Sequence, residues 1–346
     1  MHNDTRKAFN KYCAALAQLY GVENVTTSFS AAPVQEQKLI QKVQESSDFL
    51  KLINMVPVTN QAGEKVGIGV AAPHAGRTDT TQRERETSDL SVLDPQGYFC
   101  VKTDYDTHLR YAMLDAWRHH PDFAVKVQNA QLRSEALARI MVGFNGVRAA
   151  VETDRDQNPL LQDVNKGWLQ HVRERASERV LNAGKGGTGK VKIGKGGDYA
   201  NLDAAVFDLK MLLEPWYQED TQLVAIVSGD LLHDKYMPII NGQSAATEKL
   251  AADIIISQKR LGGQQAYKAP YMPGLTVMLT RLDNLSIYSQ EGSRRRHIKD
   301  KPERDRVETY SSSNDAYVVE DLGCVAILEN IEIIPADETT PETTGE

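Results

Sequence analysis

The residues with the most suggestive spacing for chemistry are the glycines and lysines of Gly184–Lys190, Gly-Lys-Gly-Gly-Thr-Gly-Lys. They match most of the Gly-x-x-x-x-Gly-Lys pattern, in which backbone N–H groups and a lysine hold nucleotide phosphates. Val191 stands where that pattern needs a Ser or Thr for the metal ion, and a charged helical pattern rather than a buried strand precedes the loop. We therefore favour a flexible connector or hairpin tip, and we keep an α/β nucleotide-binding enzyme using Gly184–Lys190 as the alternative.

The densest basic cluster of the chain lies between residues 294 and 306 and could contact the phosphates of a nucleic acid. Asp300, Glu303 and Asp305 are interleaved with it, and acidic side chains are rare in a phosphate groove. We therefore favour a subunit contact rich in charge pairs, with a nucleic-acid-binding module as a further alternative. The candidate contact residues are Arg294, Arg295, Arg296, Arg304 and Arg306.

The remaining reactive side chains form no catalytic or metal-binding set that the sequence makes visible. His119 and His120 are adjacent, so on a helix their side chains would point about 100° apart and could not share a metal ion. Ser228-Gly229-Asp230 follows an apolar run but lacks the Gly-x-Ser-x-Gly form of a nucleophile elbow. We expect a protein that is not an enzyme, with no catalytic residue, no cofactor and no bound metal.

The bulk composition limits the class of protein. The 346 residues carry a net charge of −7, which argues against a surface built to grip nucleic acid everywhere. The three cysteines, Cys13, Cys100 and Cys324, are far apart and odd in number, which fits a reducing compartment. The first residues lack the apolar core of a signal peptide, and no apolar run approaches the ~20 residues that span a bilayer. We expect a soluble, cytosolic product with no membrane contact.

The main element expected to position the candidate residues described above is a long helix, predicted from Pro121 to Phe144. At ~1.5 Å per residue it would be roughly 36 Å long, and Gly143 is able to end it. Glu135 precedes Arg139 by four residues, the favourable order for an exposed ion pair. Such a rod is either the backbone of one core or a spine against which neighbouring copies pack. The expected buried stripe is Phe123, Val127, Ala130, Ser134, Leu137, Met141 and Phe144, flanked by Leu132, Ala136 and Ile140.

A long protruding β-loop is predicted between Gln61 and Gly97. Val66, Ile68 and Val70 alternate with polar or small residues, which is the period of a half-buried strand. The following residues, 73–89, are polar and almost free of apolar side chains, so they cannot pack a core of their own. Loops of this length in a compact protein are usually functional or disordered.

Shorter patterns complete an arrangement of helices and strands. An accessible linker at about Ser28–Ala32 separates the first two predicted helices, and such a linker is where a protease would cut. Leu223–Val227 is a continuous apolar run, typical of a strand buried on both faces. The other predicted elements are helices at Thr5–Tyr20, Val34–Ile53, Leu160–Leu181 and Tyr199–Leu213, a hairpin of Thr276–Thr280 with Leu285–Ser289, and an α/β pattern over Leu231–Ser257.

Motifs spread in order over nearly the whole chain resemble the major capsid proteins of P2-like (peduovirus) contractile-tailed phages. The motifs Glu214–Asp220 (EPWYQED) and Met141–Val147 (MVGFNGV) are idiosyncratic, so chance is a poor explanation for them. The other matching stretches are Gln44–Leu50, Gly63–Val70, Asn158–Gln170, Gly194–Ala204, Leu250–Arg260, Leu282–Tyr288 and Tyr317–Asp321.

This resemblance implies an α+β protein with the HK97-like capsid fold. It assigns a scaffolding-like segment to residues 1–30, an N-terminal arm to 31–60 and an extended loop to 61–97. A peripheral domain at 98–197 carries the spine helix 121–144, and an axial domain follows at 198–290. Return strands of the peripheral domain occupy 291–334. The acidic, Thr-rich composition of residues 335–346 predicts a disordered tail.

The resemblance also implies a function and partners. It implies self-assembly of copies into pentamers and hexamers that form an icosahedral shell enclosing double-stranded DNA, held by weak non-specific contacts. The implied partners are a phage scaffolding/protease protein and a portal protein, with assembly in the cytoplasm of the host bacterium and a final location in the virion. The expected maturation cleavage lies at Phe29-Ser30, and the expected intersubunit contacts of the extended loop are Arg77, Arg83, Glu84, Arg85 and Glu86.

Overall fold

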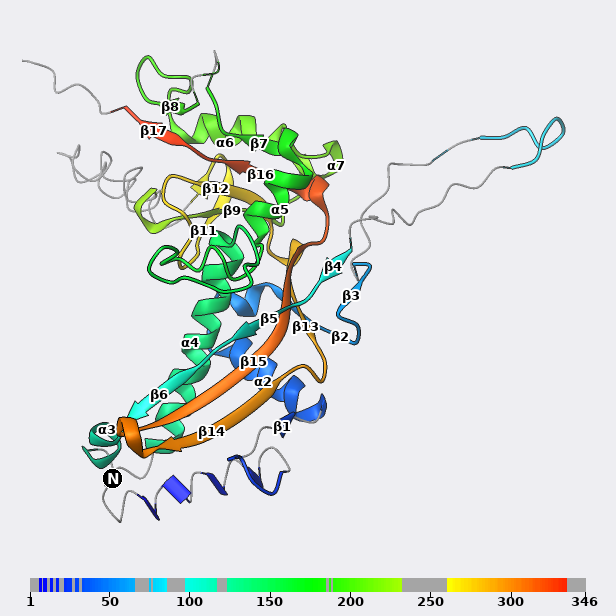
Figure 1. The fold of residues 1–346 in the computed structure, drawn as a ribbon. Coiled ribbons are helices and arrows are strands. Elements are labelled where there is room, and N and C mark those ends of the chain that lie inside the picture. Colours follow the sequence, from blue (N-terminus) through cyan, green and yellow to red (C-terminus); the bar gives the residue numbers. More distant parts are fainter. Residues whose placement is uncertain are drawn as a thin grey trace, which may run out of the picture. The chain divides into compact units, whose positions relative to one another are not determined.

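The computed structural model describes residues 6–7, 9–10, 13–14, 17–18, 22–26, 29–30, 33–65, 75, 77–85, 97–116, 123–184, 187, 189–231 and 260–334. The chain forms two compact units (Figure 1). The first unit contains Met1–Trp168 and Asp283–Asp321, and the second contains Leu169–Leu282 and Leu322–Glu346.

The first unit is organised on one long strand, β15 (Arg306–Val319). Its first half pairs with β14 (Arg295–Lys301) and its second half with β13 (Leu285–Gln290), so one strand joins both ends of the sheet. The strand order is β1-β14-β15-β13-β2, with β5 and β6 also paired to β15. The bounds of the remaining strands are Phe29–Ser30 for β1, Asn54–Val58 for β2, Val101–Asp104 for β5 and Thr107–Arg110 for β6.

Helices α2 (Pro33–Glu45) and α4 (Phe123–Asn145) lie on one face of this sheet (Figure 1), and α3 (Tyr111–Ala116) follows β6. The predicted long helix is therefore confirmed. Its predicted buried stripe is correct at Phe144, which is buried, and wrong at Ala130 and Ser134, which are exposed. The expected flank of Leu132, Ala136 and Ile140 is the buried face instead, with Glu135 and Arg139 beside it.

The end of α4 packs into an aromatic cluster of the first unit. The Trp168 ring lies 5.2 Å from the Phe144 ring and 5.6 Å from the Tyr317 ring, centroid to centroid. Gly143 makes this approach possible, because a Cβ there would lie 2.3 Å from a Trp168 ring carbon. Gly143 therefore serves packing rather than helix termination, and α4 continues to Asn145.

Two other predicted helices are shorter than expected. The helix predicted to reach Ile53 ends at Glu45, where the Gln44 side chain turns to donate to the carbonyls of Leu50 and Ile53. The helix predicted from Leu160 begins only at α5 (Trp168–Arg175), because Leu161 has a positive φ of 60°. The spacing of apolar residues alone did not predict these two turns.

The second unit contains a sheet of order β10-β11-β9-β12-β16-β7. Strand β9 (Leu223–Val227) is buried at every residue, as predicted. Helix α6 (Leu202–Lys210) begins at Asn201, whose Oδ1 accepts a hydrogen bond from the Ala204 N–H. The other strands of this sheet are Arg260–Leu261, Gln264–Lys268, Val277–Arg281, Val325–Leu328 and Val180–Leu181, for β10, β11, β12, β16 and β7 respectively.

Smaller elements complete both units. They are α7 (Pro215–Gln218), the parallel pair β8 (Val191–Ile193) and β17 (Ile331–Ile333), the antiparallel pair β3 (Ala62–Gly63) and β4 (Tyr98–Phe99), and the 3₁₀ turns Leu50–Leu52, Ser177–Arg179, Leu282–Asn284, Pro302–Arg304 and Leu322–Cys324.

The predicted hairpin of residues 276–289 is wrong. Strand β12 pairs with β9 and β16 of the second unit, whereas β13 pairs with β15 and β2 of the first. The chain changes unit between Leu282 and Asp283. Near this change, Asn284 binds the backbone of Asp321 within the first unit. Its side chain accepts a hydrogen bond from the Asp321 N–H at 2.7 Å and donates one to the Asp321 carbonyl at 2.9 Å.

The division into units differs from the expected boundaries at 197/198, 290/291 and 334/335. The second unit already begins at Leu169, β13 belongs to the first unit, and β16 and β17 belong to the second. The pairing of strands into two separate sheets decides to which unit each segment belongs. Local sequence patterns do not predict that pairing. The predicted strand through Val70, the α/β pattern of 232–257 and the tail of 335–346 lie outside the described residues.

Candidate functional site

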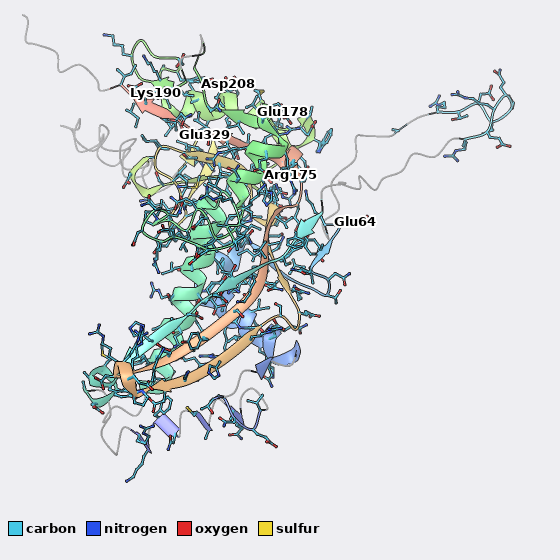
Figure 2. The ribbon with its side chains drawn as sticks, in the orientation of Figure 1. Glu64, Arg175, Glu178, Lys190, Asp208 and Glu329 are labelled. Atoms are coloured by element: carbon cyan, nitrogen blue, oxygen red, sulfur yellow. The ribbon has the colours of Figure 1, made fainter. Side chains whose placement is uncertain are left out.

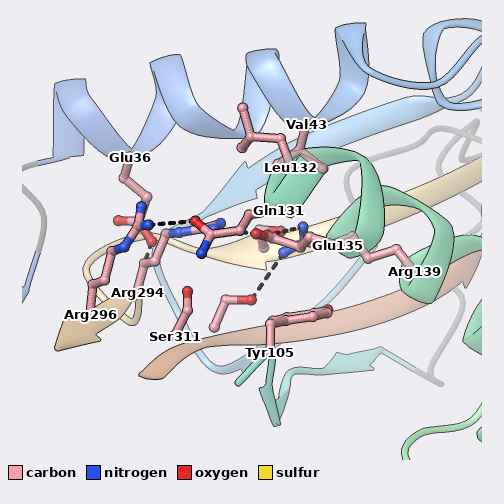
Figure 3. Close-up of polar contacts among 12 residues, drawn as sticks. Glu36, Val43, Tyr105, Gln131, Leu132, Glu135, Arg139, Arg294, Arg296 and Ser311 are labelled. Carbon is pink, nitrogen blue, oxygen red and sulfur yellow. Dashed lines mark hydrogen bonds and ion pairs between the residues drawn. The ribbon is translucent and has the colours of Figure 1, made fainter. Parts of the chain in front are cut away.

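A chain of buried charged groups joins α4 to the sheet of the first unit (Figure 3). Arg139 is fully buried, and its Nη2 lies 3.1 Å from Asp315 Oδ2, while its Nη1 donates to Glu135. Glu135 also accepts from Arg294 Nη2 at 2.7 Å. The predicted exposed pair of Glu135 and Arg139 is therefore wrong, since their face of the helix is turned toward β14 and β15.

The Asp315 carboxylate is saturated with donors. Besides Arg139, it accepts from Ser289 Oγ at 2.7 Å, Ser313 Oγ at 2.8 Å and Tyr105 OH at 3.0 Å. The Arg139 guanidinium also lies 4.9 Å from the centre of the Tyr105 ring. Such full pairing is what a buried charge requires, because an unpaired one would cost several kcal/mol.

Burial alone would raise the pKa of Glu135, but Arg294 and Arg139 outweigh it and lower the pKa to about 2. Glu135 therefore stays ionised over the whole physiological range, and its charge is needed to compensate two buried guanidinium groups. One face of the helix carries residues 132, 135, 136, 139 and 140. This spacing is the sequence feature from which the network could have been predicted.

Helix α2 is attached to the turn before β14 through another buried carboxylate, Glu36 (Figure 3). Its oxygens accept from the Gly292 N–H at 2.6 Å and the Arg294 N–H at 3.1 Å. Burial raises the pKa of Glu36, and these two N–H groups partly offset that effect. Glu36 was not predicted as a buried residue, because no local motif distinguishes it from an exposed glutamate on a helix.

The base of the predicted extended loop is a short antiparallel pair of β3 and β4, in which Ala62 lies opposite Phe99 and Gly63 opposite Tyr98. At the described part of the loop, the Asp79 carboxylate accepts from the N–H and hydroxyl of Thr81 at 3.0 and 2.6 Å. The candidate residues Arg77, Arg83, Glu84 and Arg85 are all exposed, and Glu86 lies outside the described residues.

The basic cluster at 294–306 is distributed over a hairpin formed by β14 and β15. Arg294 is 4% exposed and pairs with Glu135, so its side chain is withdrawn from any outer surface. Arg296 donates to Gln131 Oε1 at 3.0 Å, and Arg306 pairs with Glu308 at 2.6 Å. Of the five candidate arginines, only Arg295 and Arg304 are exposed.

The hairpin tip places Arg304 between exposed Glu303 and exposed Asp305. Asp305 has a positive φ of 50°, and its N–H donates to the Pro302 carbonyl, which fixes the turn. A tip of mixed charge fits a contact with another protein better than a phosphate groove.

The Gly184–Lys190 loop lies between strands β7 and β8, so it opens no helix. A phosphate loop uses the N–H groups at the start of a helix, and this arrangement lacks them. The Gly184 N–H donates to the Lys190 carbonyl at 2.9 Å, and Lys190 Nζ lies 3.6 Å from Glu332 Oε2 (Figure 2 labels Lys190). This geometry agrees with the predicted connector or hairpin tip rather than with a phosphate-binding loop.

Phe29 and Ser30, the proposed cleavage position, form β1 and pair with Arg296 and Arg295 of β14. Within the described part of the chain, no three His, Cys, Asp or Glu side chains are grouped as a metal site. Over those same residues, no helix is both long and apolar enough to span a membrane.

Comparison with known proteins identifies the family. The model of the family "Phage major capsid protein, P2 family" matches residues 8–331. The chain is 45% identical to the "Capsid proteins" of Escherichia phage P2 over 350 residues, covering 99% of this chain and 98% of the relative. It is 41% identical over 339 residues to the "Major capsid protein" of Serratia phage KSP20, covering 96% and 97% of the two chains.

The solved structures agree with the sequence relatives. A chain of the "Satellite phage P4 procapsid including size determination (Sid) protein" superposes with a TM-score of 0.81 at 43% identity, covering 96% of this chain and 99% of that one. The predicted α+β, HK97-like fold is thereby confirmed. The family consists of structural proteins, so the nucleotide-binding enzyme is not supported. This chain belongs to the P2 family of phage major capsid proteins and is a structural protein of the capsid.

Proposed function

We propose that copies of this chain assemble into pentamers and hexamers that close an icosahedral head around double-stranded DNA, in the cytoplasm of the host bacterium. The observation that carries the proposal is the superposition with the P4 procapsid chain over nearly the full length of both chains. Each copy in a closed shell touches several neighbours, so modest contacts multiply into a stable particle.

We assign the extended loop to contacts between subunits. The support is its exposed mixture of charges at Arg77, Arg83, Glu84 and Arg85, which have no role in the core of either unit. Glu86 continues the alternation in the sequence. Charge pairs at such a surface set the register of a contact more than its strength.

A second contact involves the tip of the β14–β15 hairpin, with Arg295 and Arg304 as its cationic residues. Its support is the mixed charge of the tip, with Glu303 and Asp305 also exposed. Arg294, Arg296 and Arg306 hold the hairpin in shape through Glu135, Gln131 and Glu308 rather than meeting a partner.

Maturation of the shell includes cleavage of the N-terminal segment at Phe29-Ser30 by a phage scaffolding/protease protein. A protease binds its substrate as an extended strand, and this bond is already paired with β14. Cleavage therefore requires β1 to leave that edge first. A portal protein at one position of the shell is the remaining proposed partner.

The experiment that tests the shell is negative-stain electron microscopy of the chain co-expressed with the phage scaffolding/protease protein. Closed particles are the expected result, and soluble monomers under every salt and protein concentration would refute the proposal. DNA binding by free subunits is expected to be weak and salt-sensitive, because the net charge is −7. A sub-micromolar affinity at physiological salt would contradict that part.

A further inference from the structure

The outer edge of β14 is occupied by the N-terminal part of the same chain. Strand β1 lies beside the start of β14 (Figure 1) and pairs with it antiparallel, and Phe29 is opposite Arg296. Farther along the same edge, the Ile298 N–H donates to the Val25 carbonyl at 3.0 Å. These contacts satisfy main-chain groups of β14 that β15 does not reach.

Side chains hold the same segment in place. Val25 is 1% exposed, and the Asn24 side chain accepts from the Thr26 N–H at 2.9 Å to shape the turn that carries it. Beyond Ile298, Arg6 Nη1 lies 2.6 Å from Asp300 Oδ2. Contacts with the N-terminal part of the chain thus occur at Arg295, Arg296, Ile298 and Asp300 of β14.

Without β1, β14 would be the end of the strand order β14-β15-β13-β2. Exposed edge strands recruit strands from other chains, and covering them is one way in which proteins avoid this. The covering here is slight, because β1 contains two residues and Val25 is the one buried side chain among the described residues 22–26. Short, marginal pairings of this kind open at low free energy.

We propose that the outer edge of β14, residues 295–300, is a strand-docking site, and that Val25 together with β1 (Phe29–Ser30) acts as a displaceable cap that fills it by strand addition. The site accepts a short Thr- and Ser-rich segment through main-chain hydrogen bonds. The proposal depends neither on the capsid role nor on any cleavage.

The test measures amide hydrogen exchange, residue by residue, in the full, unassembled chain. N–H groups along a strand alternate between its two neighbours, so those of Arg296 and Ile298 face the cap while those of His297 and Lys299 face β15. Phe29→Pro removes the Phe29 N–H donor that an antiparallel pair with Arg296 uses. We expect exchange at Arg296 and Ile298 to become about tenfold faster, the change for the loss of one hydrogen bond.

The amides of His297 and Lys299 are internal controls and should keep their rates. Val151→Pro is the matched control variant, because Val151 is exposed and lies outside both β14 and the capping segment. Unchanged exchange at Arg296 and Ile298 in Phe29→Pro would overturn the proposal. An equal increase in exchange rate at all four amides would also overturn the proposal. The pairing of β14 with β15 would then depend on β1, and β1 would be part of the sheet rather than a displaceable cap.

Docking is tested by adding a synthetic peptide of residues 22–30 at millimolar concentration to the Phe29→Pro chain. Restored protection at Arg296 and Ile298 would support a strand-docking site, and a peptide that itself carries Phe29→Pro should restore none. If the unmodified peptide has no effect, the edge is not a docking site. The capsid proposal is tested separately, by particle formation, so the two can fail independently.

Discussion

The side chains with the largest expected effect on stability are the buried charges beneath α4. Arg139 compensates Asp315 and Glu135, and all three are at most 8% exposed. Removing one member of such a group leaves the other charges buried without compensation, which costs about 3–5 kcal/mol.

We therefore expect Arg139→Leu to lower the free energy of unfolding by about 3–5 kcal/mol, measured as the shift of the urea midpoint of the unassembled chain. Arg133→Leu is the matched control, because Arg133 lies on the same helix and is exposed. It should change stability by no more than about 0.5 kcal/mol. Similar effects from both variants would contradict the assigned network.

The pH dependence of stability follows from Glu135. Its pKa falls from 4.5 in the unfolded chain to about 2 in the fold, so the folded state prefers the ionised form. This contribution is complete above pH 4.5 and is lost as pH falls toward 2, in total about 3 kcal/mol. Glu36 acts in the opposite direction, because burial raises its pKa.

Comparing the wild-type chain with Glu135→Gln isolates this effect, since all other titrating groups are shared. Between about pH 5 and pH 3, which bracket the unperturbed glutamate pKa of 4.5, the wild type should lose stability more steeply than the variant. Unfolding midpoints at each pH provide the measurement. Parallel curves would mean that Glu135 is not ionised through its contacts with Arg139 and Arg294.

At the scale of elements, local patterns predicted which segments are helices and strands better than which faces are buried. The periodicity of 121–144 predicted α4, and the apolar run at 223–227 predicted β9. The buried face of α4 was predicted only as a flank of Leu132, Ala136 and Ile140, because it also carries Glu135 and Arg139, which a count of apolar residues assigns to solvent. The 276–289 hairpin was missed because its two strands join different sheets, a long-range choice that local spacing does not encode.

The two candidate contact surfaces also differ in how much of each could be predicted from the sequence. That residues 61–97 form an extended loop stays a prediction, because the alternation at Val66, Ile68 and Val70 lies outside the described residues. The β3–β4 pair joins the two ends of this segment, and Arg77, Arg83, Glu84 and Arg85 are exposed. Which arginines of the basic cluster are exposed could not be predicted, because the consecutive residues Arg294, Arg295 and Arg296 alternate in direction. Arg294 and Arg296 reach Glu135 and Gln131 on α4, while Arg295 is exposed.

Gly143 determines how closely Trp168 packs on α4. A methyl group at this position would lie 2.3 Å from the Trp168 ring, and that ring is fully buried among other aromatic side chains. Gly143→Ala should therefore lower the free energy of unfolding by about 1–3 kcal/mol, despite the better helix propensity of alanine. Thermal unfolding and the near-ultraviolet circular dichroism of the tryptophan would both report the change.

Gly274→Ala is the control for that variant, because a Cβ at Gly274 would meet no atom within 4 Å. It should leave the melting temperature within the range of a neutral surface substitution. A Gly143→Ala chain as stable as the wild type would show that Trp168 does not pack against α4 as described.

At the scale of the whole molecule, the proposed capsid role predicts that folding and assembly can be separated. Apart from half-buried Thr78, the residues of the predicted extended loop from Arg77 to Arg85 are exposed, while the β3–β4 pair closes the loop at its base. Shortening a loop beyond a closed base changes chain entropy only slightly. Deleting residues 77–86 should therefore leave the unfolding midpoint nearly unchanged.

The same deletion removes the charges proposed to align neighbouring subunits, so closed shells should not form. Electron microscopy of the co-expressed deletion chain would then show soluble subunits or open aggregates, with circular dichroism like that of the wild type. A chain with Arg83, Glu84 and Arg85 replaced by serine tests the charges alone, and Asp79→Asn controls for the turn at Thr81. Normal particles from the deletion would place the essential subunit contacts elsewhere, with the β14–β15 hairpin tip as the next surface to alter.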